Sequence, residues 1–327
     1  MRRFFTFALV AVIVLAGWLG WALALPVTPA PAQKFVLLKP GYSTRRIASE
    51  LKSAGVIRSQ DAFLLWHYFH RKGSLKAGEY LFEQPSTALE VHSRLVRGDI
   101  YFHTVVIPEG YTMFDIARAV EEAGLGSSQD FVKIAQTDLP LIADIDPDAH
   151  SLEGYLFPST YQFTRTQTMP DIMGEMVKEF RKVAQEIGLK DDIHQTVTMA
   201  SIIEKETASP DERPLVASVY YNRLSKKIAL DADPSVIYAE LLDGKYAGAL
   251  HHADMQVESP YNTYRHAGLP PGPIGNPGKS SLEAAMHPAT SDYYYFVSDG
   301  NGHHRFSGNL EEHNRNVAAY RKAMQRQ

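Results

Sequence analysis

Residues 195–207 read QTVTMASIIEKET, an apolar run that ends in two glutamates. The spacing of its apolar residues predicts a helix. At about 100° per residue, Glu204 shares a face with Ala200, whereas Glu206 points to the side of Ile202. Both carboxyl groups are therefore expected to be partly buried within the fold.

The exposed face of this helix is predicted to carry His194, Thr198 and Lys205. A carboxyl group among apolar neighbours keeps its proton near neutral pH, as the acid of a sugar-cleaving enzyme does. Periodicity does not choose between Glu204 and Glu206. A structural, ion-paired glutamate near a helix end is the alternative interpretation.

A stiff loop follows about fifty residues later. Residues 259–264 read SPYNTY and residues 268–272 read GLPPG. A proline-rich loop loses little conformational entropy when it binds a ligand, and aromatic rings can stack on sugar rings. The Asn262 amide can both donate to and accept from an N-acetyl or hydroxyl group. The loop suits a pyranose chain, although a rigid loop without a ligand has the same composition.

Composition excludes several classes of function. Among the 327 residues, 33 Lys and Arg stand against 37 Asp and Glu, giving a net charge of −4 that does not favour nucleic acid. The chain has no cysteine, and its histidines do not have the spacing of a zinc site. Glycine-rich phosphate loops and Gly-x-Ser-x-Gly elbows are absent from the sequence. We therefore predict no metal site, no cofactor and no nucleic-acid partner.

The N-terminal residues predict a membrane anchor. After a tail of residues 1–3, residues 4–25 are uncharged and apolar, and as a helix they reach ~30 Å, enough to cross a bilayer. Ala22-Leu23-Ala24 resembles a signal-peptidase site, but the apolar run is longer than a signal peptide needs. Basic residues precede the run and none follows before Lys34, which places the N-terminus in the cytoplasm. Residues 26–34 are a proline-containing linker to a domain outside the cytoplasmic membrane.

The region 35–150 contains an internal repeat. Residues 36–56 superpose on residues 105–125 with a shift of 69, matching Gly41-Tyr42 with Gly110-Tyr111 and Ala54-Gly55 with Ala123-Gly124. Each copy predicts a strand, a Gly-Tyr turn and a capped amphipathic helix that ends at glycine. A similar glycine, hydroxyl residue and Ile-Ala pattern occurs in LysM-like carbohydrate-binding modules. Short strand-helix elements in general have glycines and capping residues at these positions, so the pattern also fits an ordinary strand-helix element.

Further elements are predicted from local patterns. Between the repeats we expect a turn into a strand at 76–80 and a helix over 87–97 closed by Gly98. A second domain is expected over 151–327. Its predicted elements are helices over 170–187, 211–224 and 310–324 and two strands at 293–297 and 304–306. The predicted class is α+β: one transmembrane helix, LysM-like α+β modules, and a mainly helical, lysozyme- or transglycosylase-like catalytic domain with a small β-sheet.

With these motifs in order, nearly the whole chain resembles the YceG-like family of endolytic murein transglycosylases, membrane-anchored enzymes that cut peptidoglycan glycan strands. The motifs that carry the resemblance are EGYLFP at 153–158, IEKET at 203–207, YNRL at 221–224, DPSVIY at 233–238, the loop over 261–278, His287-Pro288, and the ending from Phe306 to His313-Asn314.

The resemblance implies roles for particular residues. Glu204 is the implied catalytic acid and base, and Glu206 is a companion without an assigned role. The residues expected to contact substrate are Glu153, Asn222, Arg223, Asp233, Tyr261, Asn262, Thr263, Tyr264, Leu269, Pro270 and Gly272.

A lytic transglycosylase needs only one carboxyl group. It protonates the oxygen between N-acetylmuramic acid and N-acetylglucosamine and then takes a proton from the muramoyl 6-hydroxyl, which closes a 1,6-anhydro ring. Asp231, Asp233 and Glu258 are interpreted as structural. The alternatives are a lysozyme-like muramidase that uses water, and a non-catalytic wall-binding scaffold. The implied partners are glycan strands, the membrane and peptidoglycan synthases (penicillin-binding proteins), with action that ends strand elongation.

Overall fold

The computed structural model describes residues 2–70 and 73–325. It divides into two compact units: unit 1 comprises residues 1–104 and 162–168, and unit 2 comprises residues 105–161 and 169–327. Met1 of the predicted tail and the last two residues lie outside the described residues. Over the described residues, helices predominate and three two-stranded sheets accompany them, so the fold is α+β with one apolar helix near the N-terminus.

Helix α1 (Arg2–Ala24) opens unit 1 and is long and apolar enough, over Arg3–Ala24, to cross a membrane. Most of its apolar side chains are exposed, but Ala22 and Leu23 are buried in the core of unit 1. Just beyond the helix, the Arg58 guanidinium donates to the carbonyl oxygen of Pro26 at 2.9 Å. The C-terminal end of α1 is thus packed onto the domain that follows.

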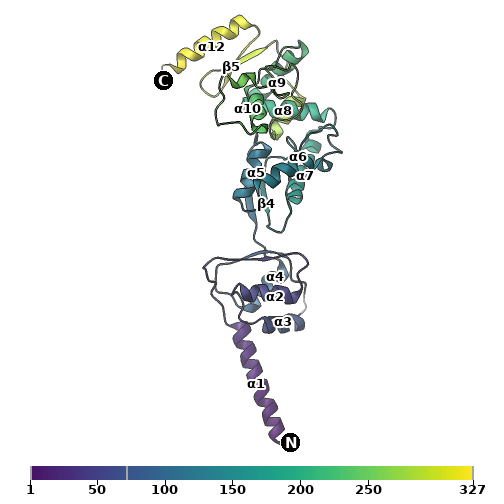
Figure 1. The fold of residues 1–327 in the computed structure, drawn as a ribbon, viewed down its shortest axis with the longest axis vertical. Helices are drawn as coiled ribbons and strands as arrows, with labels where there is room; N and C mark the ends of the chain where they lie inside the picture. Colours follow the sequence, from purple (N-terminus) through teal and green to yellow (C-terminus); the bar gives the residue numbers. More distant parts are fainter. Residues whose placement is uncertain (1, 71–72, 326–327) are drawn as a thin grey trace. The chain divides into compact units, whose positions relative to one another are not determined.

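The rest of unit 1 packs helices against a short antiparallel sheet. Its elements are β1 (Lys34–Leu38), α2 (Thr44–Ser53), α3 (Gln60–Phe69), β2 (Gly78–Phe82) and α4 (Ala88–Arg97). Strands β1 and β2 pair with Val36 opposite Tyr80, and Figure 1 shows α2, α3 and α4 gathered beside the end of α1. The predicted strand at 76–80 and helix at 87–97 correspond to β2 and α4. Helix α4 begins at a capping box on Thr87 and ends at Gly98 in the left-handed conformation.

The chain passes between the units through β3 (His103–Val106) and β4 (Thr160–Phe163), which form a second two-stranded sheet. Unit 2 contains the remaining elements. These are α5 (Met113–Glu122), α6 (Ser128–Thr137), a 3₁₀ turn (Leu139–Leu141), α7 (Met169–Ile187), α8 (Ile193–Glu206), a 3₁₀ turn (Pro210–Glu212), α9 (Arg213–Ser225), α10 (Asp233–Leu242), a 3₁₀ turn (Asp254–Gln256), α11 (Lys279–Met286), β5 (Tyr295–Ser298), β6 (His304–Ser307) and α12 (Leu310–Met324).

Both copies of the repeat adopt the same local structure. Ser43 and Thr112 cap α2 and α5, and each helix is followed by a glycine in the left-handed conformation, with φ of +73° at Gly55 and +69° at Gly124. The copies belong to different units, α2 to unit 1 and α5 to unit 2. Helix α5 and its neighbour α6 pack with unit 2 because α6 contacts both α5 and α7.

Helix α8 is at the centre of unit 2, beside α9, α10 and α11 (Figure 1). All side chains from Thr196 to Ile203 are buried. Thr198 is therefore not on an exposed face as predicted; it is fully buried, because neighbouring helices cover the face that the pattern assigned to water. Lys205 is exposed as expected.

Candidate active site

Glu204 is enclosed near the C-terminal end of α8, with 5% of its side chain exposed. Its Oε1 accepts a hydrogen bond from the Arg213 guanidinium at 2.8 Å, and its Oε2 accepts one from the backbone N–H of Gly278 at 2.9 Å. Burial raises the pKa of Glu204, and the Gly278 N–H and Arg213 act in the opposite direction. Both oxygens thus already have partners within the fold, one of them a buried cation.

Glu206, the last residue of α8, is in a different environment. It lines a cavity of about 470 Å³ and accepts a hydrogen bond from the Tyr220 hydroxyl. Burial raises the pKa of Glu206 to about 7; the Tyr220 hydrogen bond opposes this rise, and the negative charge of Asp233 adds to it. A carboxyl group with this pKa can give up a proton and take one back near neutral pH.

This space is called the Glu206 cavity below. It is lined by Glu206, Val219, Tyr220, Arg223, Leu230, Asp231, Asp233, Tyr264, Tyr295, Phe296, Leu310, His313 and Asn314. Three of the residues predicted to contact substrate, Arg223, Asp233 and Tyr264, are therefore brought together around Glu206 rather than around Glu204.

Arg223 is held rigidly in the wall of the Glu206 cavity. Its Nε donates to the carbonyl oxygen of Ala229 at 2.7 Å, and its guanidinium pairs with Asp231 and lies 5.5 Å from the centre of the Tyr295 ring. These fixed contacts orient a cation and an aromatic ring at the cavity without a further ordering cost on binding.

Tyr264 forms another part of the wall, and 38% of its surface is exposed. Its hydroxyl donates to Oδ1 of Asp233, the first residue of α10, at 2.5 Å. The loop is held in place by its own buried residues. Asn262, which is fully buried, donates to the carbonyl oxygens of Met255 and Val257 at 3.0 and 2.9 Å.

Thr263 is also buried, and its hydroxyl accepts from the N–H of Ala232 at 3.0 Å. In this structure Asn262 and Thr263 face the protein interior, so they support the loop that carries Tyr264 and are not available to a ligand. Tyr261 is half-buried, with its ring 5.1 Å from that of Tyr238.

Glu153 lies in a buried network instead of at a surface. Only 1% of it is exposed, and its carboxyl group accepts from the N–H of Met113 at 2.9 Å and from the Asn276 amide at 2.7 Å. Asn276 in turn accepts from the N–H groups of Gly154 and Leu156, both at 2.9 Å. Burial raises the pKa of Glu153 to about 8. The network fixes the start of α5 to the segment before α11, which makes Glu153 a structural residue here.

The remaining predicted contact residues lie away from the Glu206 cavity lining. Asn222 donates to the carbonyl oxygens of Ser291 and Tyr293 at 2.8 and 2.9 Å and so fixes the segment that leads into β5. Leu269 lines a different hollow, with Tyr221 and His287, and Pro270 and Gly272 are buried.

The sequence predicted no substrate contact for several cavity residues, namely Tyr220, Asp231, Tyr295, His313 and Asn314, of which Asp231 was interpreted as structural. Asp231 lies two residues before a predicted contact, and His313-Asn314 belongs to a motif quoted above, so proximity to motifs was the available signal. Over residues 2–70 and 73–325, no group of three or more His, Asp or Glu side chains is placed to hold a metal ion.

Comparison with known proteins places these features in a family. A family model described as the YceG-like family matches residues 36–319. A Bacillus subtilis protein named endolytic murein transglycosylase is 35% identical over 300 residues, which are 86% of this chain and 82% of the relative. A Streptococcus pneumoniae protein of the same name is 29% identical over 349 aligned positions, covering 95% of this chain and 63% of the relative.

Comparison with solved structures also finds a member of this family. A 2.6 Å crystal structure of a YceG-like protein from Listeria monocytogenes matches 86% of this chain and 98% of its own, with 34% identity and a TM-score of 0.57. The family match over most of the chain and these relatives show that the chain belongs to the YceG-like family.

Proposed function

We propose that this protein is an endolytic murein transglycosylase, a lyase that cleaves the bond between N-acetylmuramic acid and N-acetylglucosamine inside peptidoglycan strands and leaves 1,6-anhydro ends. The names of its relatives support this activity. The structural observation that carries it is Glu206, a carboxyl group with a pKa raised to about 7 in the wall of a cavity that also presents a cation and aromatic rings.

The environments of the two glutamates favour Glu206 over Glu204 as the acid. Glu204, the residue first predicted for this role, forms a 2.8 Å ion pair with buried Arg213, which stabilises its charged form. Burial and the negative charge of Asp233 favour the protonated form of Glu206, and only the hydrogen bond from the neutral Tyr220 hydroxyl favours its charged form. We therefore propose Glu206 as the acid and base and Glu204 as the residue that fixes α9 and the Gly278 segment to α8.

The reaction then proceeds in two proton transfers. Protonated Glu206 donates to the bridging oxygen while the C1–O bond breaks, and the 2-acetamido group of the sugar can stabilise the positive charge at C1. The Glu206 carboxylate next removes the proton from the muramoyl 6-hydroxyl, whose oxygen forms a bond to C1. Glu206 is protonated again at the end, and no water is consumed. Acid–base help of this kind typically contributes about 10² to 10⁴ in rate.

The rest of the chain supports a location at the wall. We propose that α1 anchors the protein in the cytoplasmic membrane with its N-terminus inside, that the repeated strand-turn-helix units are LysM-like and bind glycan, and that the enzyme ends strand elongation near peptidoglycan synthases. The apolar α1 and the positions of Arg2 and Arg3 support the anchor and its orientation.

One experiment tests the activity and the choice of acid together. Full-length wild type, Glu206→Gln and Glu204→Gln are incubated with purified glycan strands, and the products are weighed by mass spectrometry. We expect anhydro-ended fragments from wild type and at least about a hundredfold loss of rate in Glu206→Gln. An inactive Glu204→Gln beside an active Glu206→Gln, both folded by circular dichroism, returns the role to Glu204.

A muramidase that uses water is the second candidate because Asp233 and Asp231 line the same cavity as Glu206, and a hydrolase needs a second carboxylate. Its products would be heavier by one water and would carry reducing ends. The same mass spectra separate the two reactions. If wild type binds strands but releases neither product, the chain is a wall-binding scaffold instead.

A further inference from the structure

Helix α10 lines three hollows of unit 2 in succession. Asp233, its first residue, lines the Glu206 cavity. Pro234 and Tyr238 line a second hollow of about 470 Å³, called the middle groove, and Leu241 lines both the middle groove and a third hollow of about 530 Å³, called the distal groove. At ~1.5 Å per residue, α10 spans ~12 Å from Asp233 to Leu241.

The middle and distal grooves are contiguous because they share Arg118 and Leu241. The middle groove also contains Lys205, which lies between the two glutamates of α8 in sequence. The Phe114 ring in the distal groove lies 6.4 Å, between centroids, from the Tyr238 ring in the middle groove, so the aromatic walls of the two grooves are neighbours. Along α10, the Glu206 cavity at Asp233, the middle groove at Pro234 and the distal groove at Leu241 thus follow one another, and the first two share no lining residue.

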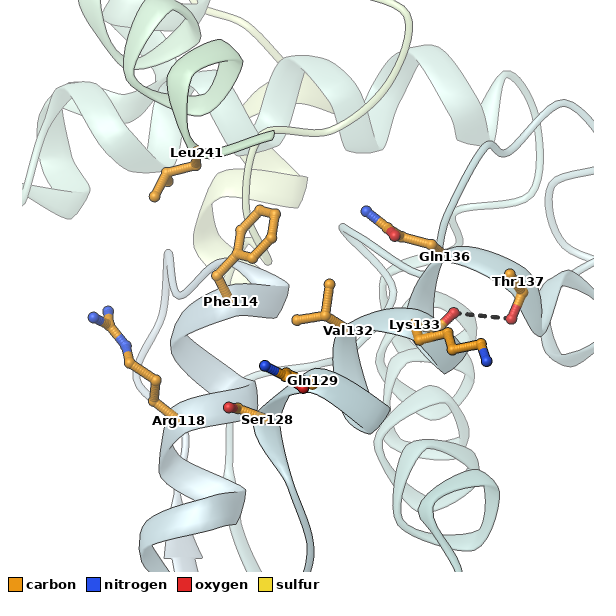
Figure 2. Close-up of a pocket in the computed structure, with 9 residues that line it drawn as sticks. All are labelled: Phe114, Arg118, Ser128, Gln129, Val132, Lys133, Gln136, Thr137 and Leu241. Carbon is orange, nitrogen blue, oxygen red and sulfur yellow. Dashed lines mark hydrogen bonds between the residues drawn. The ribbon is translucent and has the colours of Figure 1, made fainter. Parts of the chain in front are cut away.

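The distal groove combines apolar and hydrogen-bonding side chains. Its lining residues are Phe114, Arg118, Ser128, Gln129, Val132, Lys133, Gln136, Thr137 and Leu241. Figure 2 shows the Phe114 ring between Leu241 and Val132, with the Gln129 and Gln136 amides on the α6 side. All these residues belong to α5, α6 or α10, so rigid helices position them.

This chemistry fits a polysaccharide of N-acetylated sugars. An aromatic ring beside small apolar side chains can cover the C–H face of a sugar ring, and glutamine amides can pair with acetamido and hydroxyl groups as both donors and acceptors. An enzyme that cuts inside a strand must hold sugars beyond the broken bond, and grooves on the same helix as the wall of the reacting cavity can serve that purpose.

We propose that the middle and distal grooves bind the uncut arm of the glycan strand and thereby help to set where along the strand the enzyme cuts. This inference rests on the proposed function, since it assumes that the strand reacts at the Glu206 cavity. The contact residues that it assigns, Phe114, Gln129, Lys133 and Gln136, are the wall of a distal subsite.

Binding of fluorescent peptide-free glycan strands tests the subsite separately from catalysis. Full-length Glu206→Gln in detergent is the parent, and Phe114→Ala, Gln136→Ala and Lys133→Glu are added to it. Lys178→Glu is the matched control, because Lys178 is an exposed α7 lysine whose side chain is 75% exposed. Gln136 and Lys133 are exposed as well, so their variants keep the fold even if Phe114→Ala weakens it.

We expect Phe114→Ala to weaken binding of long strands about threefold to tenfold, the size of one stacking contact. Gln136→Ala and Lys133→Glu should weaken it at least about twofold, while Lys178→Glu leaves it unchanged. A tetrasaccharide, too short to reach the distal groove, should bind every variant within about twofold of the parent. Added to the active enzyme, the groove variants should broaden the length distribution of the anhydro products.

Two results would overturn the subsite: long strands that bind all variants equally, or equal losses for long strands and the tetrasaccharide. Failure of the proposed function looks different. In that case wild type releases no anhydro products, yet long-strand binding still depends on Phe114 and Gln136.

Discussion

Two glutamates separated by one lysine acquire different chemistry from the side chains that surround them. Glu204 meets a guanidinium and a backbone N–H, whereas Glu206 meets a phenol and a carboxylate at a cavity. Burial raises the pKa of both carboxyl groups, and of the two Glu206 is the one that lines the cavity.

The pH dependence of cleavage should report this acid. Glu206 must be protonated to act, and burial raises its pKa to about 7, so kcat/KM is expected to fall as the pH rises above about 7. The measurement is kcat/KM on glycan strands between pH 5 and 9. In Glu204→Gln the falling limb should stay at the same pH. A limb that moves in this variant would assign it to Glu204.

Glu153 should make folding of unit 2 depend on pH in one direction. Its pKa rises from 4.5 to about 8 on burial, so between these values the folded state holds a proton that the unfolded state has lost. The free energy of unfolding therefore decreases as the pH rises from about 4.5 to about 8 and is level above.

Glu153→Gln should flatten this dependence because an amide does not ionise, and the amide oxygen can still accept from the N–H of Met113 and from the Asn276 amide. Urea unfolding followed by far-UV circular dichroism at several pH values measures it. Tryptophan fluorescence would miss the change, since Trp18, Trp21 and Trp66 all belong to unit 1. An unchanged slope in the variant would contradict the assignment to Glu153.

At the scale of elements, the repeat shows how local sequence fixes local structure. Thr112 caps α5 through a reciprocal pair of hydrogen bonds with Asp115, and Ser43 caps α2 through one bond to the N–H of Arg46. Both caps, and the glycine after each helix, act within a few residues of the chain. This is why the repeated pattern predicted strand, turn and helix correctly in both copies.

Replacing Thr112 by alanine should destabilise α5 by about 1 kcal/mol, the usual cost of a lost N-cap. Hydrogen exchange followed by mass spectrometry should show faster exchange in the peptide over 113–122. Thr112→Ser should restore most of the protection. Ser43→Ala serves as the matched control and should speed exchange in α2 alone; an effect of Thr112→Ala confined to α2 would refute the local origin of the cap.

Patterns of this kind predict an element but not everything that covers it. The apolar spacing predicted a helix over 195–207, which the structure places at Ile193–Glu206, whereas Thr198 on its predicted exposed face is fully buried. Helices α9, α10 and α11, which lie later in the chain, all pack against this helix. The periodicity of one helix does not show whether other helices pack against its polar face.

At the scale of the whole molecule, the described residues form two compact units, and an apolar helix opens the first of them. The orientation proposed for that helix is open to a direct test because the chain has no cysteine. A cysteine placed at exposed Lys226 in unit 2 and one inserted after Met1 report on the two sides of the membrane, and the insertion keeps both N-terminal arginines.

With a membrane-impermeant maleimide on spheroplasts, we expect full labelling at position 226 and labelling after Met1 only once the membrane is permeabilised. The reverse pattern would overturn the orientation. Equal labelling of both sites before permeabilisation would show that α1 does not span the bilayer. The cysteine-free parent protein is the control for background labelling.

The amino-acid sequence by itself determined the apolar helix and the helices and strands with clear caps or periodicity. It also grouped residues in motifs, such as Arg223, Asp233 and Tyr264. All these features depend on residues only a few positions apart in the chain. Only the tertiary structure decided which glutamate lines the cavity. It also decided that Glu153, Asn262 and Thr263 are buried and hold other segments by hydrogen bonds, and that the second repeat belongs to unit 2. Those outcomes depend on contacts between residues as distant as Glu153 and Asn276, and burial and pKa follow from such contacts.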